Sequence, residues 1–202
     1  LVQRQINSEM AVEKSVKALL KSYPEKIESV LKIAIAQYPR EYKQIMCGAL
    51  RAEPALTSDV INIILRSNIA TSEDIISFAL SEEPAYAKEI VNAAVSHNPL
   101  DIENIIRVAI ITEPLMAKHV VDSTMQSYPE RILDILVVAI KALPEQVVSI
   151  VRDTLIISPD NTDVVSIAVN SSHGDKAREI ISAAIKSGFS EESATAAAIA
   201  GG

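Results

Sequence analysis

The sequence predicts an all-α protein of about thirteen short antiparallel helices that stack as hairpins. Two observations lead to this fold class. All nine prolines follow one spacing of 15 residues, with a single interval of 30, and the residues between them repeat an apolar pattern typical of one helix face. The prolines are Pro24, Pro39, Pro54, Pro84, Pro99, Pro114, Pro129, Pro144 and Pro159.

The apolar pattern is clearest when each unit is numbered from its proline as position 1. Positions 4, 7, 8, 11 and 12 are predominantly apolar, which is the i, i+3, i+4, i+7, i+8 spacing of a helix and not the alternation of a strand. Position 7 is Ile or Val in every unit from Val30 to Ile180, and position 11 is mostly small. Because Ile and Val are mediocre helix formers, packing between neighbouring helices must hold each helix in place.

Proline sets where each helix begins. It is accepted at the first helical position, because its missing N–H has no partner within the helix there, and it disfavours helix in the residue before it. Each unit is therefore expected to be a helix of about three turns, followed by a tight turn of three residues. Helices are expected to start near residues 9, 24, 39, 54, 71, 84, 99, 114, 129, 144, 160, 175 and 190.

Units without the regular proline carry other start and stop signals. Ile69 stands in the empty proline slot, and Thr71 or Ser72 can cap the helix that follows. After Pro159 the apolar face comes one residue early, and the segment 170–174 lengthens the next turn. Around the last helix, the residues 188–190 supply a glycine stop, an aromatic staple and a serine cap.

A weaker period of 30 residues makes the structural unit a helix hairpin. The residue before the proline slot is Glu in one set of turns, at Glu53, Glu83 and Glu113. In the alternate turns it is Tyr38, Asn68, Asn98, Tyr128 or Ser158. Stacked hairpins form an α-solenoid, in which each unit needs neighbours to bury its apolar face. We expect one helical-repeat domain over residues 1–202.

Composition excludes several function classes. The 202 residues carry a net charge of −7, and no cluster of Lys or Arg stands out, which argues against a nucleic-acid binder and an anionic membrane surface. The longest apolar runs, such as residues 135–140, are too short to insert across a membrane. One cysteine allows no internal disulfide, and the chain opens without a signal-peptide pattern.

Residues with reactive side chains form no recognisable constellation. The three histidines are scattered, and Cys47 lies in the middle of a helix. Asp153 occupies a position that is apolar in several other units. It is either a buried functional acid or, as we favour, a surface residue that turns outward or neighbours Arg152. We expect no catalytic residue, no metal site, no cofactor and no enzymatic activity.

The two turn edges are the candidate binding surfaces. One edge would present Tyr38, Asn68, Asn98 and Tyr128, whose side chains suit amphipathic and hydrogen-bonding contacts. The other would form an acidic ridge of Glu53, Glu82, Glu83 and Glu113. The plainer interpretation, which we favour, is that Asn caps helices, Glu keeps the turns soluble and Tyr covers the hairpin rim.

The chain resembles α-solenoid helical-repeat proteins over nearly its whole length. It lacks the Trp, Gly and Tyr pattern of tetratricopeptide repeats and the ankyrin signature, and 30 residues per hairpin is short for HEAT repeats. Its Ala- and Ile-rich helices punctuated by X-Pro, with the closing segment 194–202, look like uncharacterised bacterial Ala/Pro-repeat proteins. Many of those proteins are apparently exported. The resemblance implies an extracytoplasmic location over a cytoplasmic one, and no chemistry.

These observations favour a non-enzymatic scaffold that binds a protein partner of unknown identity. Rigid repeats hold side chains at fixed spacing, so that binding loses little conformational entropy. The alternative is a structural spacer within a larger exported or surface protein. The segment 194–200 is apolar on several sides, and we expect end-to-end self-association through this C-terminal helix.

Overall fold

The computed structural model describes residues 2–172 and 174–202, with side chains from residue 11 onward. Over these residues the chain is all-α, with thirteen α-helices and no strand. The helices are α1 (Val2–Ser22), α2 (Ile27–Gln37), α3 (Tyr42–Leu50), α4 (Thr57–Arg66), α5 (Ser72–Glu82), α6 (Ala87–His97), α7 (Ile102–Thr112), α8 (Ala117–Ser127), α9 (Ile132–Ala142), α10 (Val147–Ile157), α11 (Thr162–Ser171), α12 (Ala177–Lys186) and α13 (Glu191–Gly201).

Short 3₁₀ turns precede most of the α-helices. Every proline except Pro159 opens a 3₁₀ turn of three residues, and the α-helix proper begins at position 4 of the unit. A regular unit thus consists of three 3₁₀ residues, eleven α-helical residues and one linking residue, which accounts for the period of 15. The 3₁₀ turns are η1 (Pro24–Lys26), η2 (Pro39–Glu41), η3 (Pro54–Leu56), η4 (Pro84–Tyr86), η5 (Pro99–Asp101), η6 (Pro114–Met116), η7 (Pro129–Arg131), η8 (Pro144–Gln146) and η9 (Gly174–Lys176).

A single residue links most consecutive helices, so the expected three-residue turn is wrong. Asn98 shows the geometry: its N–H donates to the carbonyl of Ala94 at 3.0 Å, and its own carbonyl accepts from the N–H of Asp101 at 3.1 Å. Both backbone groups of the linking residue are therefore bonded, one to each helix. Its φ of −138° is open to any L-residue, which explains why Tyr, Asn, Glu and Leu all occupy this place.

The irregular starts follow the expected capping. Thr71 caps α5 by accepting from the N–H of Asp74 at 3.1 Å, and Ser190 caps α13 by accepting from Ser193 at 3.1 Å. Gly188 has a φ of +113° and ends the preceding helix. The first helix differs from expectation, because α1 begins at Val2 and not near residue 9.

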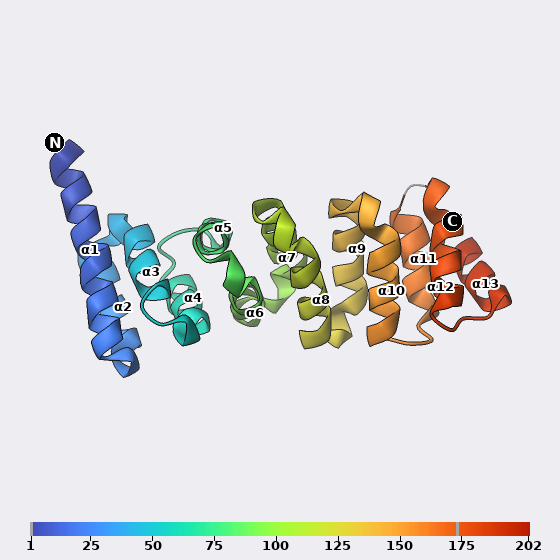
Figure 1. The fold of residues 1–202 in the computed structure, drawn as a ribbon, viewed down its shortest axis with the longest axis horizontal. Helices are drawn as coiled ribbons and strands as arrows, with labels where there is room; N and C mark the ends of the chain where they lie inside the picture. The colour runs from blue at the N-terminus through green and yellow to red at the C-terminus, as the bar shows by residue number, and fades with distance from the viewer. Residues whose placement is uncertain (1, 173) are drawn as a thin grey trace. The chain divides into compact units, whose positions relative to one another are not determined.

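The chain forms two compact units, residues 1–101 and 102–202, and the expected single domain over 1–202 stays a prediction. Within each unit a helix packs against the next helix and against the second next (Figure 1). In the first unit α1 contacts α3, and α4 contacts both α2 and α6. In the second unit the series α7, α9, α11, α13 and the series α8, α10, α12 pack in the same way.

Two faces of each repeat helix meet different neighbours. We call positions 7, 10 and 11 the preceding face and positions 8 and 12 the following face. Gly48, at position 10 of α3, lies so close to α1 that a Cβ there would be 2.4 Å from the carbonyl oxygen of Glu13. Thr154, at position 11 of α10, places its hydroxyl 3.4 Å from the sulfur of Met125, at position 12 of α8. Position 11 of one helix thus packs on position 12 of the helix two before it.

Candidate partner-binding groove

An apolar groove of about 630 Å³ runs between α1 and α2. We call it the α1–α2 groove, after the two helices that line it. Both helices belong to the first unit and are labelled in Figure 1. Its lining is mostly apolar, with Lys26 of η1 as its charged member. The lining residues important here are Ser15, Leu19, Val30, Ile33, Ala34 and Tyr38.

The groove lining includes preceding-face positions of α1 and α2, which are less covered than the same positions of α3 to α10. Position 7 is buried in every helix from α3 to α12, and position 11 is buried in every helix from α3 to α10. In α1 the same positions, Ser15 and Leu19, are exposed, and Leu19 is 47% exposed; in α2 they are Val30 and Ala34, which are only partly buried. Ile33, at position 10, is 58% exposed. The internal repeats therefore show what fits such a face, which is the following face of another amphipathic helix.

Sequence reasoning missed this groove, although one signal was present. Position 11 is Ala or Thr in most units, whereas α1 carries Leu19 there. The size of this side chain does not by itself identify the groove, because Ile64, at position 11 of α4, is also large and is fully buried.

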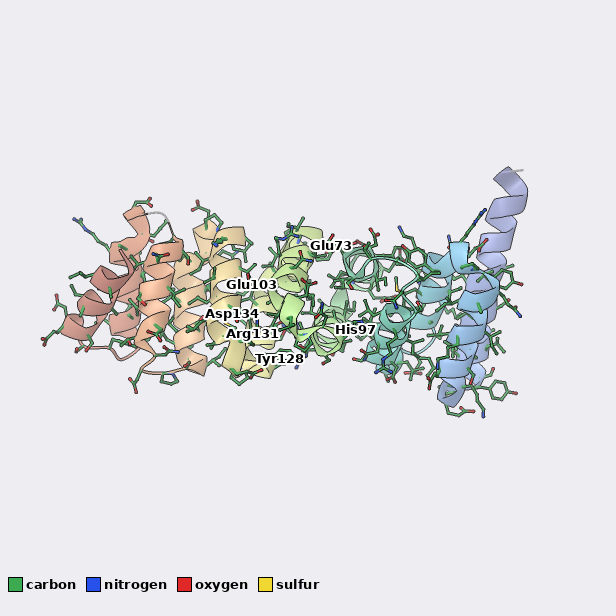
Figure 2. The ribbon with its side chains drawn as sticks, turned by 180° about the vertical axis from the view of Figure 1, so that it is seen from behind. Glu73, His97, Glu103, Tyr128, Arg131 and Asp134 are labelled. Atoms are coloured by element: carbon green, nitrogen blue, oxygen red, sulfur yellow. The ribbon has the colours of Figure 1, made fainter. Side chains whose placement is uncertain are left out.

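The expected Tyr and Asn edge is only partly assembled. Tyr38 links α2 to η2, lines the α1–α2 groove and is 45% exposed. Asn68 and Asn98 lie at the ends of α4 and α6 and are exposed; Asn68 has a φ of +51° and so serves the chain reversal there. Tyr128 belongs to the second unit, where Figure 2 shows it at the lower edge. Tyr38 lines the α1–α2 groove, and partner binding at this edge stays a prediction.

The expected acidic ridge contains two residues that are neutralised by a cation. Arg51, just after α3, donates to Glu82 at 2.6 Å, and its Nε lies 3.9 Å from Glu83. It also reaches Glu13 of α1 at 3.0 Å, so one guanidinium connects α1, α3 and α5. Glu53 is exposed near the same end, and Glu113 lies in the second unit. The pairing shows Glu82 and Glu83 acting within the fold; whether the ridge binds a partner stays a prediction.

Asp153 also serves the packing of neighbouring helices. Its carboxylate accepts a hydrogen bond from Lys118 of α8, and Arg152 lies 3.7 Å away on the same helix. Lys118 donates to Asp122 as well, at 2.7 Å. The hydrogen bonds from the ammonium to Asp122 and then to Asp153 raise the pKa of Lys118 and keep it charged. This cluster joins α8 to α10.

Cys47 is buried in α3 beside acidic groups. Burial, followed by the charge of Glu13, raises the pKa of the Cys47 thiol to about 12, with Arg51 opposing the shift and Glu82 adding to it. The thiol remains protonated at neutral pH, whereas a cysteine nucleophile requires a thiolate.

The described residues contain neither a metal-binding cluster nor a membrane-spanning helix. Within them no group of three or more His, Cys, Asp or Glu side chains is placed to hold a metal ion. None of the helices in this part of the chain combines the length and the apolar character that a membrane crossing requires. In the comparisons with known proteins, no family model, no curated protein and no solved structure matches this chain.

Proposed function

We propose that this protein is a non-enzymatic binding scaffold that receives an amphipathic helix of a protein partner in the α1–α2 groove. The observation that supports the proposal is the contrast between equivalent positions. Positions 7 and 11 of the preceding face are buried in every helix from α3 to α10, whereas they are exposed in α1 and only partly buried in α2. The groove therefore continues an interface that the protein forms many times within itself.

The expected partner helix has apolar residues at the spacing of positions 8 and 12, so that one side chain per turn enters the groove. Val30, Ile33 and Leu19 offer aliphatic contacts along the groove, and Tyr38 adds an aromatic ring at its end. The helices α1 and α2 are already formed, so that the receiving surface loses little conformational entropy on binding. Most of the conformational entropy lost on binding therefore comes from the partner segment, which becomes ordered in the groove.

A labelled peptide of residues 114–128 tests the groove. In the folded chain this segment presents its following face, Val121 and Met125, to neighbouring helices. Fluorescence anisotropy should show binding to the intact protein, with at least a tenfold weaker affinity for Ile33→Lys, because the new ammonium would have to be buried against the peptide. A peptide carrying Met125→Lys should bind equally poorly.

Leu100→Lys is the matched control, since Leu100 is a highly exposed residue of the same unit outside the groove. It should bind the peptide as the unchanged chain does. Equal binding to all three proteins, or no binding to any, would refute the groove as a helix receptor. The second result would favour the alternative of a structural spacer.

A further inference from the structure

We infer that the α1–α2 groove is occupied by helix α13 of a second copy of this chain, which joins the copies head to tail. The inference rests on the proposed function, because it names the partner of the same groove. It begins from the opposite face of the repeat, which is open at α12 and α13.

Helix α13 exposes its following face. Counted from the N-cap, Thr195 and Ile199 of α13 correspond to Ile76 and Leu80 of α5, which starts with the same type of cap. Ile76 and Leu80 are buried, whereas Ile199 is 75% exposed. The following face of α13 borders a surface hollow of about 560 Å³ that includes Thr195, Ala196 and Ile199.

The neighbouring helix repeats this observation. Position 12 is buried in every helix from α3 to α10, but Ile185, at position 12 of α12, is 39% exposed. Both helices therefore expose, at position 12, a following-face residue that is buried in α3 to α10. The uncovered face of α1 and α2 is a preceding face, and in the interior of the protein these two kinds of face pack on each other.

The internal repeats also predict the register of the contact. Met125, at position 12 of α8, packs against Thr154, at position 11 of α10. If α13 of one copy precedes α1 and α2 of the next, the same rule pairs Ile199 with Ala34 and Ile185 with Leu19. In each pair one side chain lies in α12 or α13 and the other in α1 or α2.

Charge supports a second copy over an arbitrary helix. Lys26 lines the α1–α2 groove, and Lys14 and Lys17 lie on α1, where the nearby Glu13 is engaged by Arg51. The hollow on α13 is lined by Glu191 and Glu192, and residues 187–202 contain no Lys or Arg. The acidic residues of α13 would thus meet a groove whose charged lining residue is the cation Lys26. A contact between different faces on two copies is heterologous, so it joins copies head to tail into open chains or closed rings and not into a two-fold dimer.

Sedimentation velocity on three samples tests this arrangement. The unchanged chain should form oligomers that grow with concentration. Ile33→Lys, which blocks the groove, and Ile199→Lys, which blocks the helix, should each be monomeric alone. Both residues are largely exposed, so neither change should disturb folding. Mixed in equal amounts, the two variants should form a dimer that grows no further, because each retains one open face.

A monomeric unchanged chain at several hundred micromolar would overturn the inference. Oligomers that persist in Ile199→Lys but not in Ile33→Lys would also overturn it, because they indicate a two-fold contact between grooves. In either case the peptide of residues 114–128 is then tested on Ile199→Lys. Binding would leave the proposed function standing, whereas loss of both peptide binding and self-association would refute the two together.

Cysteine cross-linking tests the register. In a Cys47→Ala background, a chain with Ile199→Cys and a chain with Ala34→Cys should form a disulfide-linked pair on mild oxidation. The control replaces Ala34→Cys by Leu100→Cys, which offers an accessible thiol outside the groove. At least tenfold more cross-linked product with Ala34→Cys than with the control is expected, and equal yields would overturn the assigned contact.

Discussion

Replacing Gly48 by alanine tests the close approach of α1 and α3, on which the geometry of the α1–α2 groove depends. A Cβ at this position would lie 2.4 Å from the carbonyl oxygen of Glu13 and 3.2 Å from its Cα, and both atoms belong to the backbone. A side chain could rotate away, but a helix backbone cannot. Relief therefore requires α1 to move about 1 Å further from α3 to reach ordinary van der Waals separation.

The expected loss of stability combines two opposing effects. Overfilling a packed interface costs about 1–3 kcal/mol, and alanine returns up to about 1 kcal/mol because it favours helix over glycine. We expect Gly48→Ala to lower the free energy of unfolding by about 1–2 kcal/mol. Movement of α1 would also disturb the 3.0 Å ion pair between Arg51 and Glu13.

Urea denaturation followed by circular dichroism measures the change, and hydrogen exchange locates it, with faster exchange expected in α1. Gly174→Ala is the matched control, because a Cβ at Gly174 would meet nothing within 4 Å. It should leave the midpoint nearly unchanged. If Gly48→Ala proves as stable as the unchanged chain, or if both variants lose the same stability, the described contact between α1 and α3 is wrong.

Three further predictions test other parts of the fold. Ile105→Asp should abolish the cooperative thermal transition of the second unit, because Ile105 is buried and a buried unpaired charge is costly. Glu103→Ala should change the free energy of unfolding by no more than about 0.5 kcal/mol, because Glu103 is exposed. Equal effects of the two changes on the melting temperature would contradict the assigned face. Arg51→Met should lower the free energy of unfolding, measured by urea denaturation, by about 1 kcal/mol. Lys32→Met should lower it less, because the ion pair of Lys32 with Glu28 is exposed; the reverse order would disprove the bridging role of the guanidinium. Because Cys47 has a raised pKa, its unfolded thiol ionises above about pH 9 while the folded thiol keeps its proton until about pH 12. Its contribution to stability should therefore be lost as pH rises, by about 1–2 kcal/mol between pH 8 and 10.5 relative to Cys47→Ala, and parallel pH profiles of the two proteins would oppose this.

The sequence pattern predicted the helices well because proline and apolar spacing act locally. Proline restricts the residue before it, and the 3.6-residue period cannot be satisfied by a strand, so that helix type and most starts were determined within each unit. The 3₁₀ turn was not predicted. A 3₁₀ turn and an α-helix differ little in where they place side chains over only three residues, so the apolar pattern does not distinguish them.

Side-chain partners were less predictable because they come from helices far apart in sequence. The turn positions placed Glu82 and Glu83 correctly near a helix end, since the proline spacing determines where α5 stops. The charges of Glu82 and Glu83 are neutralised by Arg51, which lies 31 residues before Glu82 and directly follows α3. The packing of α3 against α5 brings these charges together. The 15-residue period of the sequence does not show which side chains of the two helices meet.

The α1–α2 groove was hidden from the sequence for a related reason. Positions 7 and 8 are both aliphatic in most units, so the pattern shows that a residue is apolar but not which neighbour covers it. The structure adds a direction, because Thr154, at position 11 of α10, contacts Met125, at position 12 of the helix two before it. Ile33 and Ile199 therefore have similar side chains and opposite roles, one lining a groove and the other exposed on a helix that could enter it. The proposed head-to-tail contact follows from this difference, because it places an exposed following-face residue of one copy against an exposed preceding face of the next.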